Sequence, residues 1–138
     1  MHIPDNYLSP ASCAVLAVAA APVIVLSIKK VKVQLNENKE LAPMLGIAAS
    51  LSFLLMMFNV PVPGGTTAHA VGGTLLAILI GPYAASLALT VALLLQAFLF
   101  GDGGILALGV NIFNMAIVMP FVGYGIYSWF RKHHHESL

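Results

Sequence analysis

Long apolar runs with few charged residues constrain this chain more than any other feature of its sequence. A helix that crosses a bilayer needs about 20 apolar residues. Four runs approach or exceed that length: Ala11–Ile28, Leu41–Val60, Tyr83–Phe100 and Ile105–Phe130. Charged residues make up only 8% of the 138 positions, against roughly 25% in soluble domains. Lipid must cover most of such a surface, so we expect an all-α, polytopic transmembrane helical bundle that forms a single domain over residues 1–138.

A shorter apolar stretch, Ala70–Ile80, lies between the second and third long runs. As a helix it would span roughly 17 Å, less than the hydrocarbon core of about 30 Å. It therefore either lies at the interface or is continued by irregular backbone that protein surrounds within the membrane.

Charge placement decides between these two readings, because lysines and arginines mark cytoplasmic loops. The basic residues follow the first and last runs: Lys29, Lys30, Lys32 and Lys39, then Arg131 and Lys132. Five spans, with the N-terminus outside and the C-terminus cytoplasmic, satisfy both clusters, whereas four do not. The short segment is therefore predicted to cross. Two such short clusters also give no basic face for nucleic acid.

This topology places Met1-His2, the Val60–His69 loop and the Gly101–Gly104 turn on the outer side of the membrane. Loop 29–41 and the tail 131–138 face the cytoplasm. The first ten residues, MHIPDNYLSP, contain no Lys or Arg, unlike a secretory signal peptide, so we expect the N-terminus to be retained. The lone Cys13 excludes an internal disulfide and a cysteine-based zinc cluster.

A histidine directly after a free amino terminus forms a chelator. The Met1 amine, the deprotonated His2 amide and a His2 imidazole nitrogen can close two fused rings around one metal ion, and His69 can fill the remaining corner. Square-planar nitrogen coordination is typical of Ni(II) or Cu(II), whereas zinc prefers a tetrahedron. The sequence therefore predicts a transition-metal site at Met1, His2 and His69. The run His133–His135 lies across the membrane and is excluded from it.

Several polar residues are candidates to support these ligands, since outer-shell groups commonly orient metal-binding histidines. Asp5 could brace the N-terminal segment or cap the first helix, and Gln96 could instead bond between helices. Asp102, within GDGG, is interpreted as a turn residue. The complete set of candidates is Asp5, Thr66, Thr67, Gln96, Asn111 and Asn114.

Four segments together resemble the NikM/CbiM family, the substrate-binding (S) components of energy-coupling factor (ECF) transporters for nickel and cobalt. They are MHIPDNYLSP, PGGTTAHAVGGT, FGDGG and LGVNIFNM. The resemblance covers essentially the whole chain and implies that Met1, His2 and His69 coordinate the ion. It also implies a multi-pass protein of a prokaryotic cell membrane. Family members usually have about seven spans, so we expect this chain to be an N-terminal portion of the family's length.

The resemblance further implies partners: a coupling transmembrane protein, two cytoplasmic ATPases and commonly a small companion membrane protein. The chain has no Walker-type phosphate loop, so no ATP site is expected in it. We predict high-affinity capture of Ni(II), favoured over Co(II), rather than an enzymatic activity. A self-sufficient channel or secondary carrier would need polar residues through the spans, and an intramembrane metalloenzyme would need an open metal position and a general base.

Overall fold

The computed structural model describes residues 2–134 and consists of helices joined by short connections, with one β-hairpin. In chain order the elements are α1 (Pro10–Glu37), α2 (Leu41–Met57), β1 (Val60–Val62), β2 (Thr66–Ala68), α3 (Gly73–Ile80), α4 (Pro82–Phe100), α5 (Leu108–Asn111), the π-helix η1 (Ile112–Val118) and α6 (Met119–His134). The all-α bundle expected from the apolar runs is confirmed, apart from the hairpin, which the sequence did not predict.

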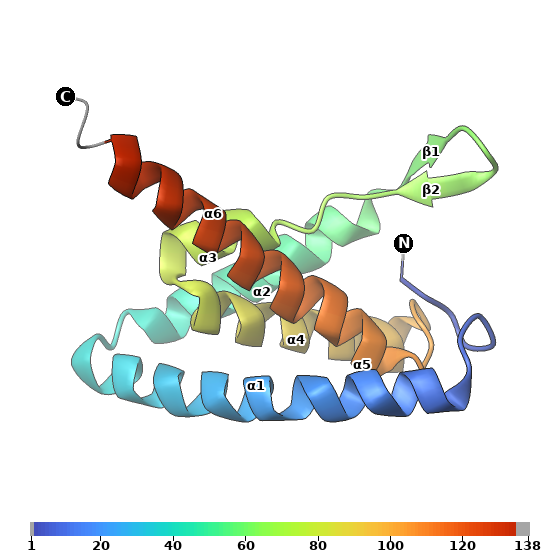
Figure 1. The fold of residues 1–138 in the computed structure, drawn as a ribbon, viewed down its shortest axis with the longest axis horizontal. Coiled ribbons are helices and arrows are strands. Elements are labelled where there is room, and N and C mark those ends of the chain that lie inside the picture. Colours follow the sequence, from blue (N-terminus) through green and yellow to red (C-terminus); the bar gives the residue numbers. More distant parts are fainter. Residues whose placement is uncertain (1, 135–138) are drawn as a thin grey trace.

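The path of the chain follows the predicted order of crossings. In Figure 1, α1 runs from the end of the bundle near the N-terminus to the opposite end, and α2 returns. Helices α3 and α4 run out and back in the same way. The continuous helix α5–η1–α6 then runs to the end opposite the N-terminus. Within residues 2–134, three helical segments are long and apolar enough to cross a membrane: Pro10–Glu37, Pro82–Phe100 and Leu108–His134. Helix α2 has 17 residues, or about 26 Å at 1.5 Å per residue, and falls just short of that class.

Several predicted boundaries were wrong, and α1 differs most. It begins at Pro10, where the Ser9 side chain accepts a bond from the Ser12 amide and proline suits the first helical position. It then continues through Pro22 to Glu37. The lysine-rich part of the predicted loop 29–41 is therefore helical and extends the helix beyond its apolar portion.

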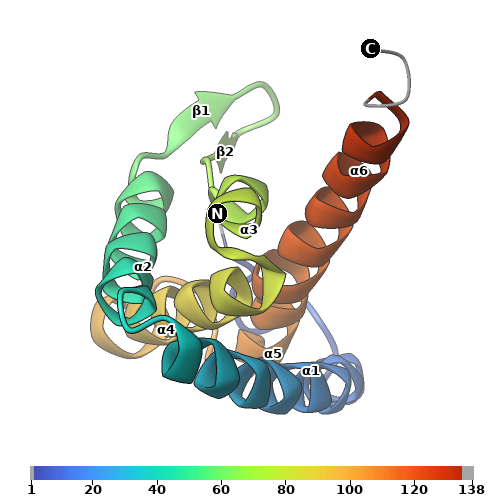
Figure 2. The ribbon, with the colours of Figure 1, turned by 90° about the vertical axis from the view of Figure 1, so that its left-hand side faces the viewer.

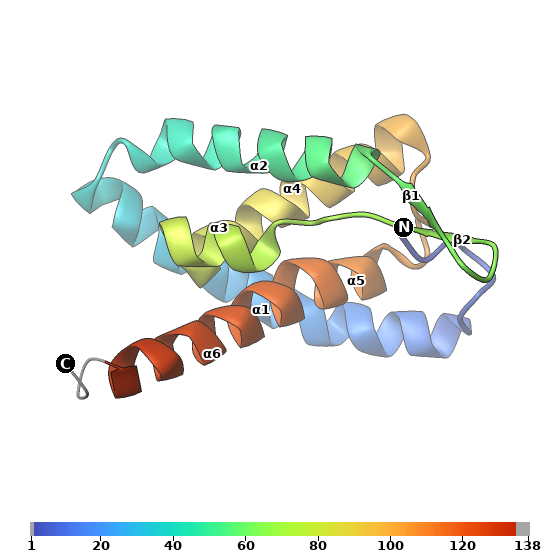
Figure 3. The ribbon, with the colours of Figure 1, turned by 90° about the horizontal axis from the view of Figure 1, so that it is seen from above.

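The short segment forms a half-length helix that is buried on one face, at Leu76 and Ala77, and exposed on the other, where Leu75 and Leu79 are 50% and 62% exposed. Viewed along the bundle, α3 lies between α2 and α6, above the layer that contains α1 and α4 (Figures 2 and 3). It has only eight residues, and the irregular residues 69–72 lead into it. Close packing explains its position: a side chain at Gly123 of α6 would collide with Thr74 of α3.

Helix α4 forms the centre of the bundle. It carries ten buried residues, among them Ala84, Ala88 and Ala92 at four-residue spacing. Small residues at this spacing let neighbouring helices approach closely, and here the stripe packs inside the chain. Outer helices instead present large apolar side chains outward: Val15 and Val18 of α1 are 66% and 71% exposed. Such exposure suits a lipid environment.

Candidate metal centre

The N-terminal segment is fixed to the bundle through Ile3 and Asn111. The Ile3 amide donates to Asn111 Oδ1 at 2.9 Å, and Asn111 Nδ2 donates to the Ile3 carbonyl at 3.1 Å. The Gly104 amide donates to the same carbonyl at 3.0 Å. Asn111 is 2% exposed, so both backbone groups of Ile3 are paired in a largely dry site. These contacts hold the neighbouring residue, His2, at one place on the bundle.

The next residues of the segment lie against the turn that follows α4. Asp5 Oδ1 accepts a bond from the Ala107 amide at 3.1 Å, which ties this segment to the turn. A side chain at Gly104 would collide with the Asp5 carboxylate and backbone, so glycine permits the close approach. Ile3 and Leu8 add apolar contacts to a buried cluster of Cys13, Ala107 and Val110. Cys13 is buried there as a small apolar residue.

His69 follows the β-hairpin directly. Strands β1 and β2 pair Val60 with Ala68, and the Ser52 hydroxyl of α2 donates to the Val71 carbonyl at 2.7 Å. The backbone on both sides of His69 is therefore held. Its Nδ1 lies 3.1 Å from the Ala70 carbonyl oxygen, an acceptor that requires the proton on Nδ1. The lone pair is then on Nε2, which is the atom available as a ligand.

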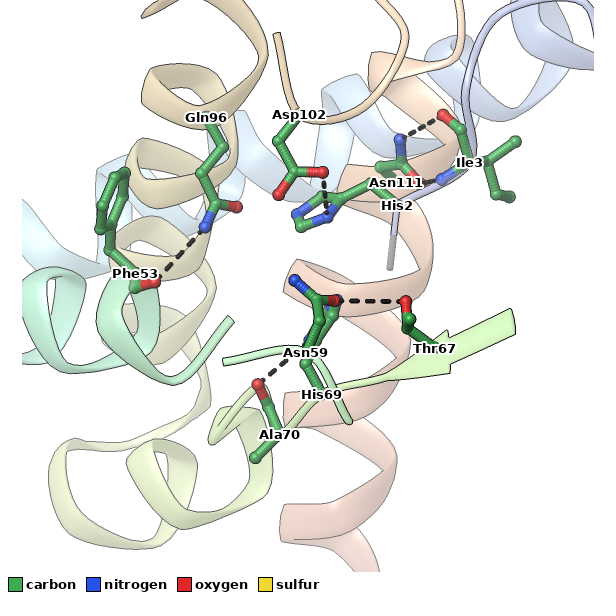
Figure 4. A network of polar contacts seen from close by, with 10 residues as sticks. All are labelled: His2, Ile3, Phe53, Asn59, Thr67, His69, Ala70, Gln96, Asp102 and Asn111. Atoms are coloured by element: carbon green, nitrogen blue, oxygen red, sulfur yellow. Dashed lines mark hydrogen bonds and ion pairs between the residues drawn. The ribbon is translucent and has the colours of Figure 1, made fainter. Parts of the chain in front are cut away.

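The two histidines meet between these supports, as Figure 4 shows. Their ring centroids are 5.3 Å apart. With metal–nitrogen bonds of about 2.0–2.1 Å, the centroids of two imidazoles on one ion lie within roughly 6 Å of each other. His2 Nδ1, His2 Nε2 and His69 Nε2 are all buried without a hydrogen-bond partner. Buried polar atoms normally have partners, so one nitrogen of each ring is available to bind an ion.

Asp102 and Gln96 are the polar neighbours of His2. Asp102 Oδ1 lies 3.3 Å from His2 Nδ1, although the angle does not make a hydrogen bond. Gln96 is fully buried, its Nε2 donates to the Phe53 carbonyl at 3.4 Å, and its Oε1 is unpartnered. Burial lowers the pKa of His2 below the ordinary value of 6.5, while Asp102 and, less strongly, Gln96 raise it. Burial prevails, so the imidazole tends toward the neutral form that binds metals.

The remaining predicted residues are Thr66, Thr67 and Asn114. Thr67 donates to Asn59 Oδ1 at 3.4 Å, which braces the hairpin, and Thr66 lies in the same strand. Asn114 is exposed on η1, whereas Asn111 is at the site. Met1 lies outside the described residues, as does His135. Across residues 2–134, no group of three or more His, Cys, Asp or Glu side chains could hold a metal ion, so side chains alone do not complete this site.

Sequence reasoning missed the position of Asp102. It lies in the turn as expected, between Gly101 and Gly103 with φ of 63° and 93°, yet its carboxylate faces His2. Gly103 also packs against the His2 side chain. The signal was present in the sequence: this turn was placed on the same side of the membrane as His2.

The chain matches known proteins over nearly its whole length. Residues 2–138 match the family described as "Cobalt uptake substrate-specific transmembrane region", CbiM. The chain is 70% identical over all 138 residues to the "Probable fused nickel transport protein LarMN" of Lactiplantibacillus plantarum, and covers 42% of that protein. It is 51% identical over 128 residues, 93% of this chain, to the "Fused nickel transport protein NikMN" of Rhodobacter capsulatus, covering 36% of it.

A solved transition metal transporter has the same fold, with a TM-score of 0.88 and 55% identity over 97% of this chain and 58% of the other. The chain thus spans about two fifths of the curated relatives above and somewhat more than half of the solved transporter. With its apolar spans, it is a multi-pass membrane protein. Other relatives are named cobalt transport proteins. The match over residues 2–138 and the shared fold together show that this chain belongs to the CbiM family.

Proposed function

We propose that this chain captures a transition-metal ion at the outer side of the membrane as the substrate-specific component of an importer. The observation that carries the proposal is the approach of His2 and His69, whose ring centroids are 5.3 Å apart and whose rings carry buried nitrogens without hydrogen-bond partners. Two relatives are named as nickel transport proteins, which supports a metal cargo for the same fold.

The proposed ligands are four nitrogens: the Met1 amine, the His2 amide, His2 Nδ1 and His69 Nε2. Of the two ring nitrogens of His2, only Nδ1 can close a small ring that includes its own amide nitrogen. His2 Nε2 then keeps the proton, and the unpartnered Gln96 Oε1 is the acceptor on its side of the ring. Gln96 and Asn111 act as positioning residues, the first on the ring of His2 and the second on the backbone of Ile3.

Ni(II) is the favoured cargo over Co(II). Deprotonating an amide requires an ion high in the divalent affinity series, and a planar set of four nitrogens is the geometry of Ni(II) or Cu(II). The ion leaves slowly from such a chelate, so release requires a conformational change driven from elsewhere. We assign that work to an ATPase acting with other membrane subunits, since this sequence has no Walker-type phosphate loop.

We assign the partner surface to the outer helices, because the alanine stripe of α4 is already buried. An apolar groove between α1, α2 and α4, with a volume of about 500 Å³, is lined by residues that include Ile28, Gly46 and Val91. A side chain at Gly46 would meet no atom within 4 Å. Gly46→Leu would fill part of this groove and leave the metal site unchanged. We therefore expect it to weaken coupled uptake more than metal affinity.

The alternatives are a self-sufficient carrier and a metalloenzyme. A carrier needs a polar route onward from His69, whereas α3 is the apolar sequence GTLLAILI. The hydroxyls of Ser27 and Thr90 bond to carbonyls four residues earlier in their own helices, so they offer no route either. An enzyme needs an open coordination position and a general base, and four nitrogens fill the plane.

Absorption spectroscopy and titration of the purified protein test the capture site. Ni(II) should give a yellow, diamagnetic, low-spin form, and His2→Ala and His69→Ala should each abolish tight binding. A green, paramagnetic six-coordinate form with unchanged affinity in both variants would refute the ligand set. In vesicles without ATPase partners, the chain should not accumulate Ni(II) against a gradient; uphill uptake there would support the carrier.

A further inference from the structure

The C-terminal end of α6 leaves the bundle obliquely and carries both aromatic and basic side chains. All three views show it diverging from the other helices, at the end of the molecule opposite the N-terminus (Figures 1, 2 and 3). Arg131 and Lys132 follow directly on Trp129 and Phe130. The basic pair is predicted to face the cytoplasm, and tryptophan is enriched where a membrane meets water. This part of α6 therefore lies at the depth of the lipid headgroups.

Apolar and polar side chains lie on opposite faces of this helical end. The apolar face consists of three residues that are each more than half exposed, Val122, Ile126 and Trp129. Each of them is followed two positions later by a polar residue, namely Tyr124, Ser128 and Arg131. Two positions turn an α-helix by about 200°. A helix divided in this way, with a basic polar face, suits a membrane interface, where its apolar face meets acyl chains.

The polar face carries a groove with a volume of about 390 Å³, lined by Tyr124, Ser128, Arg131 and Lys132. These side chains offer two hydroxyls, a guanidinium and an ammonium group, and all four can donate hydrogen bonds. None of these lining residues is acidic. Guanidinium groups bind phosphate oxygens through two parallel hydrogen bonds. The groove therefore suits a phosphate group.

The two cations of the groove have no anionic partner within the described chain. Across residues 2–134, neither Arg131 nor Lys132 forms an ion pair. The acidic residues Glu37 and Glu40 belong to the connection between α1 and α2 instead. Two basic residues are enough to orient α6 across the membrane, but that role requires neither a groove nor hydroxyl groups. A bound phosphate would neutralise the cations and also use the hydroxyls.

We propose that the end of α6 is an interfacial anchor that binds the headgroup of an anionic phospholipid in the cytoplasmic leaflet. The apolar face enters the acyl region, and the groove on the opposite face takes the phosphate. A zwitterionic headgroup is disfavoured because its choline would bring a further positive charge to Arg131 and Lys132. Basic residues near an anionic surface contribute about 1 kcal/mol each, so the pair should prefer anionic over zwitterionic lipid about 30-fold. This site shares no residue with the metal centre.

Fluorescence of the wild-type protein tests the anchor without any substitution. Trp129 is the one tryptophan of the chain, so its emission reports the lipids beside the basic pair. The purified full chain is placed in phosphatidylcholine vesicles that contain brominated phosphatidylglycerol or brominated phosphatidylcholine, which quench tryptophan on contact. Brominated phosphatidylglycerol should quench Trp129 at a far lower mole fraction. Equal quenching by the two lipids would overturn the proposal.

Two double variants with matched charge locate the binding. Arg131→Gln with Lys132→Gln should abolish the preference for brominated phosphatidylglycerol. Lys29→Gln with Lys30→Gln removes the same charge from the same end of the molecule, on α1, and should keep the preference. Both proteins should bind Ni(II) as the wild type does, which checks their folding. Equal lipid preferences in the two variants would show that the basic pair of α6 is not the site.

A third variant separates the groove from its charge. Tyr124→Phe with Ser128→Ala keeps both cations and removes the two hydroxyls, so it should lower the preference for phosphatidylglycerol severalfold. An unchanged preference would overturn the groove. Soluble glycerol phosphate, added to the wild-type protein, should not reverse the quenching. Reversal would show that the groove binds free phosphate esters and would overturn the lipid as its ligand.

Discussion

Replacing Asn111 with alanine should release the N-terminal segment and weaken metal binding without breaking the bundle. Asn111 makes two hydrogen bonds to Ile3, at 2.9 and 3.1 Å, and is 2% exposed. Each such bond contributes about 0.5–1.5 kcal/mol net, so the change should cost the docked segment about 1–3 kcal/mol. If metal binding requires the docked segment, the affinity for Ni(II) falls by about 5- to 150-fold.

Isothermal titration with Ni(II) measures this effect, and Asn114→Ala is the matched control. Asn114 is the same residue type one turn further along the same helix, yet its side chain is exposed. The Asn114→Ala protein should bind Ni(II) with the affinity of the wild type. Asn111→Asp should be intermediate, because an ionised aspartate keeps the acceptor for the Ile3 amide and loses the donor to the Ile3 carbonyl. Equal affinities for Asn111→Ala and Asn114→Ala would refute the coupling between segment docking and metal binding.

Three further outcomes are expected. Gly104→Ala should reduce Ni(II) affinity strongly, since the added methyl collides with Asp5. In the control Gly125→Ala the methyl meets no atom within 4 Å, so this variant should bind Ni(II) normally. Equal Ni(II) affinities for the two variants would contradict the proposed packing. Because burial lowers the pKa of His2 below 6.5, unfolded chains bind the proton first as pH falls. Thermal stability of the apo-protein should therefore be full above pH 6.5 and decline below it, and His2→Asn should flatten that decline. Replacing His133–His135 together should leave tight binding unchanged, and loss of binding would place the site on the cytoplasmic side.

Much of the fold could be predicted because a bilayer restricts the chain to few solutions. Apolar length fixed the existence of the long helices, and the two basic clusters fixed the order of crossings. Helix ends were harder to predict. A charged residue such as Lys29 ends an apolar run without ending the helix, and α1 continues to Glu37. The hairpin Val60–Ala68 was also missed. Its strands have three residues each, too short for an alternating pattern to identify.

The approach of the two histidines was predictable from the sequence, whereas the residues around them were less so. His2 and His69 were paired because the topology placed both on one side of the membrane, and the structure brings their rings together. Which polar residues lie beside the two histidines depends on the direction of each side chain. Asn111 and Asn114 are only three positions apart, with the π-helix beginning between them at Ile112. Asn111 is nevertheless buried and Asn114 exposed. Asp102 looked like a turn residue because its glycine neighbours require positive φ, and the direction of its carboxylate is not encoded locally.

The central claim is that the terminal amine and His2 together chelate the ion, and one titration tests it most directly. A protein carrying one added glycine before Met1 has the same side chains, but its terminal amine is displaced by a residue from the fused-ring position. Isothermal titration with Ni(II) should show that tight binding is lost in this protein and present in the form that begins at Met1. Equal affinities for the two proteins would contradict the chelate.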